Sequence, residues 1–379
     1  MKIGLITSAY DEMKAGIATY ISNLILSINR IDKINEYTLI HHSKVHDEMY
    51  RSNKELIIPY PRIPLKKTIG ENFYLSLKLK KYNFDIVHEL GQKNSFIFNF
   101  PSKKILTIHD LTPMLFPQTH GVINVFLHKF LLPKAAKNAD KIIADSENTK
   151  KDVINYLGIP QENIKVIHCG VSENFKIIDK ENDKKRIDLI RLKHGLPEKY
   201  ILTVSTLEPR KNLLTLIKAY HKLKKNKIKH KLIVIGAKGW KYHNIFNAVK
   251  QYNLENDVIF LGFIPNNELP VIYNLSDIFV YPSIYEGFGL PPLEAMACGI
   301  PVVTSNTSAL PEVVGNAGIM VNPYNPDEFT NAFYEVINNE GLKKEMIEKG
   351  LERVKTFSWE KNARETKEIY DDVTTYNFS

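Results

Sequence analysis

Short apolar runs alternate with helix-like segments along almost the whole chain, and this alternation narrows the possible folds more than any other feature. In the segment 17–28, apolar residues recur at helical spacing and give a helix one apolar face. Strands joined by helices in this way form parallel sheets covered on both faces, so we predict an α/β protein. The expected strands are 3–7, 37–40, 86–88, 104–108, 141–144, 164–167, 200–204, 231–235, 258–261, 278–281, 301–304 and 318–321.

The clearest change in composition is the stretch 179–186, where every residue is polar or charged. A chain of 379 residues is long enough for two domains, each with its own core. We therefore predict two α/β domains, 1–180 and 181–357.

Two carboxylates, Glu286 and Glu294, lie eight residues apart on either side of a glycine-containing loop. Gly287 and Gly289 leave the backbone of this loop open to close approach by a ligand. This spacing suits a ligand that has both hydroxyls and phosphates, as a nucleotide-sugar has.

Two prolines at 291–292 fit the start of a short helix, and Gly299 fits its end. Glu294 is then expected in the first turn, near backbone N–H groups that can hold an anion. In the simpler alternative, Glu294 only complements the helix dipole. That alternative explains neither the glycines nor Glu286.

The run 281–315 resembles the retaining glycosyltransferases of family 4, whose signature is a Glu, seven residues and a second Glu. Similarity also covers Pro301-Val-Val-Thr-Ser305 and Ala317-Gly-Ile-Met-Val-Asn-Pro323, and it runs with gaps from about residue 3 to about residue 370. The resemblance implies the GT-B fold: two Rossmann-like domains facing across a cleft, with a C-terminal helix that crosses back to the first domain. Here that helix is 358–379, with Ser358 as its N-cap.

The resemblance also implies roles for individual residues. Glu286 is expected to bind the hydroxyls of the transferred sugar and to favour positive charge at the anomeric carbon, and Glu294 to hold the ribose hydroxyls. Main-chain atoms of Phe263 are expected to contact the base. Backbone N–H groups of the loop are expected to stabilise the leaving diphosphate; the loop residues are Gly287, Phe288, Gly289 and Leu290.

The turn after the strand 200–204 carries two adjacent cations, Arg210 and Lys211, just before a helix that Asn212 is expected to cap. Cations are disfavoured at the positive end of a helix, so an anion is expected beside them. A diphosphate suits a guanidinium fork and a lysine point charge. The alternative is a pair of solvated loop cations.

Two further candidates lie in the first half. Gly16 opens a helix after the first strand, where relatives carry a glycine pair and this chain has Ala15-Gly16; its backbone can approach phosphate or acceptor. His109 follows the strand 104–108, and the resemblance places it beside the transferred sugar. With Asp110 it can orient a hydroxyl or accept a proton, or it can simply close the strand end.

No cofactor is expected, because the nucleotide-sugar is a substrate. The sequence has no pair of aspartates separated by one residue and no cluster of Cys and His at ligand spacing, so we predict metal-independent catalysis. No residue suggests itself as a covalent nucleophile.

The net charge of +9 is concentrated in residues 1–180, which have 25 Lys and Arg against 18 Asp and Glu. Lysines interleaved with apolar residues predict peripheral contact with an anionic membrane, although a merely solvated basic surface is the alternative. No nucleic-acid motif accompanies the charge, so no nucleic acid is expected as a partner. The first residues read as a strand rather than a signal peptide, and we expect a cytoplasmic protein at the inner face of the membrane.

Together these features predict a retaining glycosyltransferase that moves a hexose from a nucleotide-sugar donor to a hydroxyl of a glycan or lipid-linked saccharide acceptor. Similarity of the segments 107–113 and 206–212 to mannosyltransferases of bacterial polysaccharide assembly favours GDP-mannose as donor. UDP- and dTDP-sugars remain open. So do two other functions, a nucleotide-sugar epimerase and a non-catalytic module that binds nucleotide-sugar or membrane.

Overall fold

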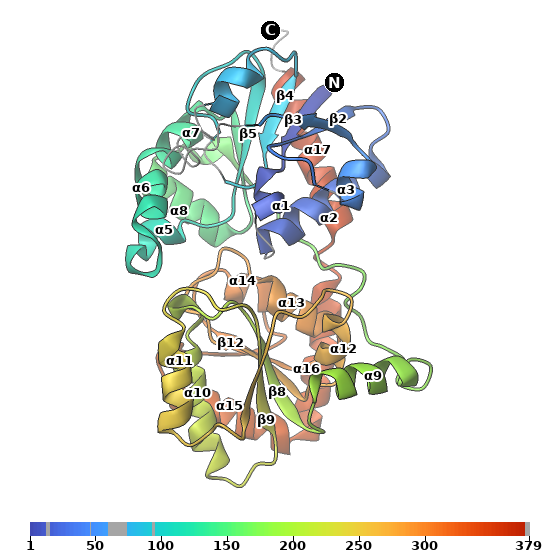
Figure 1. The fold of residues 1–379 in the computed structure, drawn as a ribbon, viewed down its shortest axis with the longest axis vertical. Coiled ribbons are helices and arrows are strands. Elements are labelled where there is room, and N and C mark those ends of the chain that lie inside the picture. Colours follow the sequence, from blue (N-terminus) through green and yellow to red (C-terminus); the bar gives the residue numbers. More distant parts are fainter. Residues whose placement is uncertain (13–15, 46, 60–73, 93–94, 376–379) are drawn as a thin grey trace. The chain divides into compact units, whose positions relative to one another are not determined.

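The computed structural model describes residues 1–12, 16–45, 47–59, 74–92 and 95–375. The chain divides into two compact units (Figure 1). Unit 1 contains Met1–Gly170 and Ser358–Ser379, and unit 2 contains Val171–Phe357. The polar stretch 179–186 therefore belongs to unit 2.

Unit 1 is built on a seven-stranded sheet in which all neighbouring strands are parallel, in the order β3-β2-β1-β4-β5-β6-β7. Apart from the edges, the strands are almost wholly buried, as expected where helices cover both faces of a parallel sheet. The strands are β1 (Lys2–Ile6), β2 (Glu36–His41), β3 (Lys54–Ile57), β4 (Ile86–Glu89), β5 (Lys103–Ile108), β6 (Lys141–Ala144) and β7 (Ile164–Val166).

Strand β3 was not predicted from the sequence. This strand has the sequence KELI, lies at the edge of the sheet and is mostly exposed. An edge strand pairs on one side only and needs few apolar residues, and charged residues on it discourage pairing with another chain. Its pattern is therefore too polar to be recognised as a strand.

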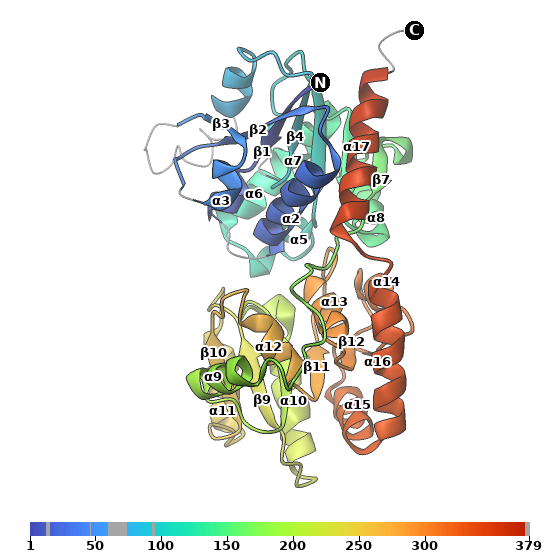
Figure 2. The same ribbon diagram turned by 90° about the vertical axis from the view of Figure 1, so that its right-hand side faces the viewer.

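The helices of unit 1 whose bounds lie wholly within the described residues are α1 (Ser8–Glu12), α2 (Gly16–Ile31), α3 (Glu48–Arg51), α5 (Thr112–Leu115), α6 (Val122–Phe130), α7 (Leu132–Asn138), α8 (Glu147–Leu157) and α17 (Trp359–Thr375), with 3-10 turns η1 (Pro117–Thr119) and η2 (Gln161–Asn163). The C-terminal helix α17 packs along α2 (Figures 1 and 2). Its start is capped as expected, because Ser358 Oγ accepts a hydrogen bond of 3.1 Å from the N–H of Lys361. Farther along, Tyr370 lies 2.7 Å from Nδ1 of the buried His88 on β4.

Unit 2 has a six-stranded parallel sheet in the order β10-β9-β8-β11-β12-β13. Its strands are β8 (Tyr200–Val204), β9 (Lys231–Ile235), β10 (Val258–Gly262), β11 (Ile278–Tyr281), β12 (Val302–Ser305) and β13 (Ile319–Val321). Its helices are α9 (Lys184–His194), α10 (Leu213–Lys224), α11 (His243–Gln251), α12 (Leu269–Asn274), α13 (Leu290–Ala297), α14 (Leu310–Val314), α15 (Pro326–Asn338) and α16 (Glu340–Val354), with the 3-10 turn η3 (Pro209–Lys211).

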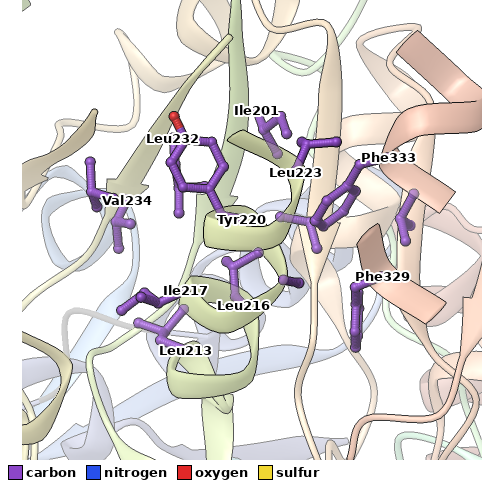
Figure 3. Close-up of a cluster of buried hydrophobic side chains, with 14 of the residues drawn as sticks. Ile201, Leu213, Leu216, Ile217, Tyr220, Leu223, Leu232, Val234, Phe329 and Phe333 are labelled. Atoms are coloured by element: carbon purple, nitrogen blue, oxygen red, sulfur yellow. The ribbon is translucent and has the colours of Figure 1, made fainter. Parts of the chain in front are cut away.

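The core of unit 2 forms where α10 and α15 pack against the sheet (Figure 3). Tyr220 of α10 and Phe329 and Phe333 of α15 are fully buried there among aliphatic side chains. This packing fixes the start of α10, and with it the loop that carries the basic pair. Within the described ranges, no helix combines the length and apolar character needed to cross a bilayer.

Candidate active site

The loops that follow β8 and β11 carry the basic pair and the first carboxylate of the predicted site. Strand order in unit 2 reverses between β8 and β11, which are parallel neighbours. Ligands of open parallel sheets bind outside the carboxyl ends of the strands at such a reversal. Lys211 follows β8 and Glu286 follows β11, so the topology brings together two residues that are 75 positions apart.

Glu286 pairs with both cations of the turn. Lys211 Nζ lies 2.6 Å from its Oε1, and Arg210 Nη1 lies 3.1 Å from its Oε2. Arg210 also donates to Oε1 of Glu208 at 2.9 Å and to the carbonyl oxygen of Tyr285 at 2.7 Å. The carboxylates of Glu286 and Glu208 thus neutralise the charges of Lys211 and Arg210. The anion that was expected beside these two cations is supplied by the protein itself.

The charges in this cluster shift one another's pKa values. Burial alone would raise the pKa of Glu286, but the charges of Lys211 and Arg210 and hydrogen bonds from Lys211 and Ser283 lower it to about 2. Burial and the charge of Arg210 lower the pKa of Lys211, while Glu286 opposes this shift. Glu286 is therefore ionised at neutral pH. The ammonium of Lys211 also donates a hydrogen bond to Tyr281 Oη at 2.9 Å.

Hydrogen bonds hold the loop after β11 against the turn after β8. Ser283 Oγ donates to the Glu286 carboxylate, and the N–H of Ile284 donates to the carbonyl oxygen of Arg210 at 2.9 Å. The N–H of Glu286 donates to Ser308 Oγ at 2.9 Å. Gly289 has a φ of +115°, and a Cβ there would lie 2.9 Å from Leu310 Cδ2, so this position requires glycine.

Asn212 was predicted to cap α10. It occupies the N-cap position, but its side chain accepts no hydrogen bond from a backbone N–H of the helix. Its Nδ2 donates to the carbonyl oxygens of Pro282 and Pro323 at 3.1 and 2.6 Å, and its backbone is left-handed, with a φ of 56°. The side chain therefore ties the basic turn to the loops after β11 and β13, and it contacts the helix start through the Thr215 hydroxyl, which donates to Asn212 Oδ1 at 2.8 Å.

Glu294 lies in the second turn of α13, one turn later than predicted, because the helix begins at Leu290. The prolines 291–292 have no N–H, so they remove two of the donors that a helix start would offer an anion. Glu294 Oε2 accepts a hydrogen bond of 3.0 Å from Tyr273 Oη. Burial raises the pKa of Glu294 to about 7, although the Tyr273 hydrogen bond lowers it in part.

The other predicted donor contacts differ in exposure. Phe263, just after β10, is 60% exposed and open to a ligand. Phe288 is buried with its ring 5.7 Å from that of Phe357, so only its backbone can serve a ligand. Gly287 is buried beside it, and Leu290 begins α13.

His109 lies in unit 1, directly after β5, and its charged partner is Asp145 rather than the adjacent Asp110. Nδ1 lies 2.7 Å from Asp145 Oδ2, and Nε2 lies 2.8 Å from the carbonyl oxygen of Leu90. Both neighbours accept hydrogen bonds, so both ring nitrogens donate, as in an imidazolium. Burial alone would lower the pKa of His109, but Asp145 and the Leu90 carbonyl raise it. This arrangement argues against His109 as a proton acceptor.

Asp110 orders its own loop. Its Oδ1 accepts hydrogen bonds from the N–H and the Oγ1 of Thr112 at 2.9 and 2.6 Å. Gly16 is the exposed first residue of α2, and a Cβ there would meet nothing within 4 Å. The fold itself thus does not require glycine at this position. Ala15 lies outside the described residues.

Several side chains that hold the predicted residues were not predicted from the sequence, among them Ser283, Glu208, Tyr273 and Asp145. Ser283 and Glu208 lie within three residues of Glu286 and Lys211, so a search for nearby polar groups can find them. Tyr273 lies 21 residues from Glu294, and Asp145 lies 36 residues from His109, so only the fold reveals them. In the part of the chain that the structure describes, no group of three or more His, Cys, Asp or Glu side chains is placed to hold a metal.

Comparisons with known proteins agree with this architecture. The model of the family described as Glycosyltransferase Family 4 matches residues 16–175, and that of Glycosyl transferases group 1 matches residues 184–353. Among solved structures, sucrose-phosphate synthase from Thermosynechococcus elongatus superposes with a TM-score of 0.80 over 100% of both chains at 22% identity. That likeness establishes the GT-B fold.

Curated relatives are closer in sequence. The O-antigen chain mannosyltransferase B of Escherichia coli is 30% identical over 71% of this chain and 70% of its own length. The serotype-specific mannosyltransferase WbdA of Escherichia coli is 34% identical over 70% of this chain, but the match spans only 33% of WbdA. These matches show that the chain belongs to glycosyltransferase family 4 and has the GT-B fold.

Proposed function

We propose that this protein is a glycosyltransferase that transfers a hexose from a nucleotide-sugar to a hydroxyl of a glycan or lipid-linked saccharide, with retention of the anomeric configuration. The observation that carries the proposal is the cluster of Lys211, Arg210 and Glu286 at the strand reversal of unit 2. It combines cations suited to a diphosphate with a carboxylate suited to sugar hydroxyls.

In this proposal, binding of the donor breaks the ion pairs that Glu286 forms with Lys211 and Arg210. The diphosphate of the donor takes over Lys211 and Arg210, and Glu286 is released to accept hydrogen bonds from the sugar. The bond between the anomeric carbon and the diphosphate oxygen breaks, and its electron pair leaves with the diphosphate. The acceptor oxygen bonds to the same face of the carbon, and its proton passes to a leaving phosphate oxygen. Electrostatic stabilisation of the leaving group is the largest catalytic contribution.

GDP-mannose is the donor we propose first. Its support is the identity of 30–34% to relatives that are named mannosyltransferases. Glu294 then holds the ribose hydroxyls, and main-chain atoms at Phe263 contact the base. UDP- and dTDP-sugars are the alternatives, and the thermal-shift experiment described below must distinguish them from GDP-mannose.

We place the reaction in the cytoplasm, at the inner face of the membrane, where a lipid-linked acceptor is presented. The basic character of residues 1–180 supports contact with anionic lipid. Nucleic acid is not a proposed partner.

We also propose that catalysis needs no divalent cation, because Lys211 and Arg210 neutralise the leaving diphosphate. Transfer should then continue at full rate in EDTA. A loss of activity that Mn²⁺ or Mg²⁺ restores would refute this part of the proposal.

The decisive experiment is a thermal-shift panel of GDP, UDP, dTDP and ADP with their sugar conjugates, without metal. A ligand that binds only the native protein raises its unfolding temperature by mass action. A selective rise with GDP and GDP-mannose is expected. A rise of the unfolding temperature with UDP or dTDP ligands would mean that the donor is a UDP- or dTDP-sugar. No rise with any of these ligands would favour a non-catalytic protein.

A further inference from the structure

Helix α6 is one of the helices of unit 1 (Figure 1). Large apolar side chains are exposed to solvent along most of its length. Val122, Ile123, Phe126 and Phe130 are between 54% and 85% exposed. Of the nine residues of this helix, only Leu127 is buried. Exposed apolar groups that lie together on one element mark an interaction surface, whereas single ones do not.

The four exposed residues lie on one side of the helix. At 100° per residue, Val122, Ile123, Phe126 and Phe130 fall within a sector of about 100°, and the buried Leu127 lies just outside this sector, beside Ile123. The rings of Phe126 and Phe130 lie 4.7 Å apart, so they form a continuous apolar surface. We call these four residues the α6 face.

Cations accompany the α6 face, and carboxylates do not. No Asp or Glu occurs from Leu111 to Ala139. The same segment has three lysines, Lys129, Lys134 and Lys137, and all three are exposed. Lys129 follows Phe126 by three residues and so lies beside the α6 face.

We propose that the α6 face docks on an anionic lipid bilayer, with its aromatic and aliphatic side chains in the headgroup–acyl boundary and the three lysines at the lipid phosphates. A helix with an apolar face and basic flanks is suited to lie in the plane of such an interface. A second copy of this chain fits less well, because it would bring lysines against lysines in a protein of net charge +9.

This assignment rests on the membrane-face location that we propose, but not on the donor or the reaction. Failure of the two can therefore be separated. Vesicle binding tests the α6 face, and the thermal-shift panel tests the donor site in unit 2.

The test is co-sedimentation with vesicles of phosphatidylcholine containing 30% phosphatidylglycerol, a composition chosen for roughly physiological anionic content. The full-length protein is compared with the double variant Phe126→Ser/Phe130→Ser. The control variant is Leu189→Ser/Leu192→Ser on α9, a basic helix in unit 2 whose leucines are 66% and 86% exposed. Circular dichroism and donor thermal shifts check that each variant is folded.

The α6 variant should bind these vesicles at least about tenfold more weakly, and the α9 variant should bind like the original protein. Replacement of Lys129, Lys134 and Lys137 by Gln should weaken binding roughly fivefold per lysine at low salt, and less at high salt.

Unchanged vesicle binding by the α6 variant would overturn the proposal, as would loss of binding in the α9 variant alone. If the original protein binds no vesicles but light scattering shows a dimer that the α6 variant loses, the face is a contact between copies of the chain and the proposal is wrong.

Discussion

Lys211 donates a hydrogen bond of 2.6 Å to Glu286, and this buried ion pair joins the loops at the strand reversal of unit 2. An anion that binds the turn after β8 must compete with Glu286 for Lys211. The pair therefore keeps the ammonium in position without a ligand. In the proposed reaction, the arrival of a diphosphate is also what releases the carboxylate toward the sugar.

Replacement of Lys211 by Ala should lower turnover at least about a hundredfold, the usual cost of losing one preorganised group that stabilises developing charge. Sugar transfer is measured at saturating donor, so that weaker donor binding does not hide the effect. The matched control is Lys222→Ala, because Lys222 also forms an ion pair of 2.6 Å, with Asp327, but on the exposed surface. Normal turnover of Lys211→Ala would remove this lysine from the mechanism.

Replacement of Glu286 by Gln should have opposite effects on binding and turnover. The variant loses the anion that competes for Lys211 and Arg210, so a nucleoside diphosphate should bind several-fold more tightly by calorimetry. Turnover should fall at least about a hundredfold, because the carboxylate no longer stabilises positive charge at the anomeric carbon.

Glu208→Gln is the control for this exchange. Glu208 forms an ion pair with Arg210 but does not contact the sugar in the proposed reaction, so this variant should bind the diphosphate more tightly and keep most of its turnover. If Glu286→Gln bound the diphosphate more weakly than the original protein, Glu286 would not be a competitor.

Replacement of Asp145 by Asn should lower the pKa of His109, because burial then acts without its charged partner. His109 has a raised pKa in the folded protein. Its pairing therefore stabilises the fold fully below the ordinary histidine pKa, and this contribution is lost as pH rises through the raised value. Breaking a buried pair should also cost about 3–5 kcal/mol of stability.

Nuclear magnetic resonance of the His109 ring tests this expectation, with the signal assigned from its absence in His109→Gln. In the original protein, the His109 ring should titrate above the ordinary histidine pKa. Asp110→Asn is the control. Asp110 contributes least to the raised pKa of His109, so its replacement should lower this pKa less than the replacement of Asp145. Equal effects of the two substitutions would contradict the assignment of Asp145 as the partner.

Most of the fold follows from the sequence because parallel strands that are buried on both faces consist almost entirely of apolar residues. The run IFVY in β11 consists only of β-branched and aromatic residues, which is typical of a buried strand, and its observed bounds, Ile278–Tyr281, match the prediction. The edge strand β3 shows the limit of this reasoning. Its sequence, KELI, carries two charges because half of its surroundings is water, and only its pairing with β2 makes it a strand.

The candidate site is predictable to the extent that its residues lie in local motifs. Glycines, prolines and adjacent cations point to Lys211 and Glu286, but not to their pairing, which depends on the order of β8 and β11 in the sheet. The same holds for His109, since its neighbour in sequence is Asp110 and its neighbour in space is Asp145. Local spacing identifies chemical groups, whereas the partners of those groups are set by topology.

Glu294→Gln should change how stability depends on pH. The folded pKa of Glu294 is about 7, above the ordinary value of 4.5. Between these values the folded protein holds a proton that the unfolded chain has lost, so the free energy of unfolding falls as pH rises. The whole effect is about 3 kcal/mol, and a neutral Gln, which can still accept the hydrogen bond from Tyr273, removes it.

Thermal midpoints of the original protein and the variant, measured from pH 5 to pH 8, test this. The midpoint of Glu294→Gln relative to the original protein should rise by about 5–10 °C across that range, as expected for a unit of this size. A constant difference between the two proteins would mean that Glu294 does not titrate in this window. A nucleotide whose ribose donates to Glu294 favours the carboxylate, so its binding at pH 7 should also release about half a proton or less, because about half of the groups are already ionised there. Calorimetry in buffers of different ionisation enthalpy should show no such release in the variant.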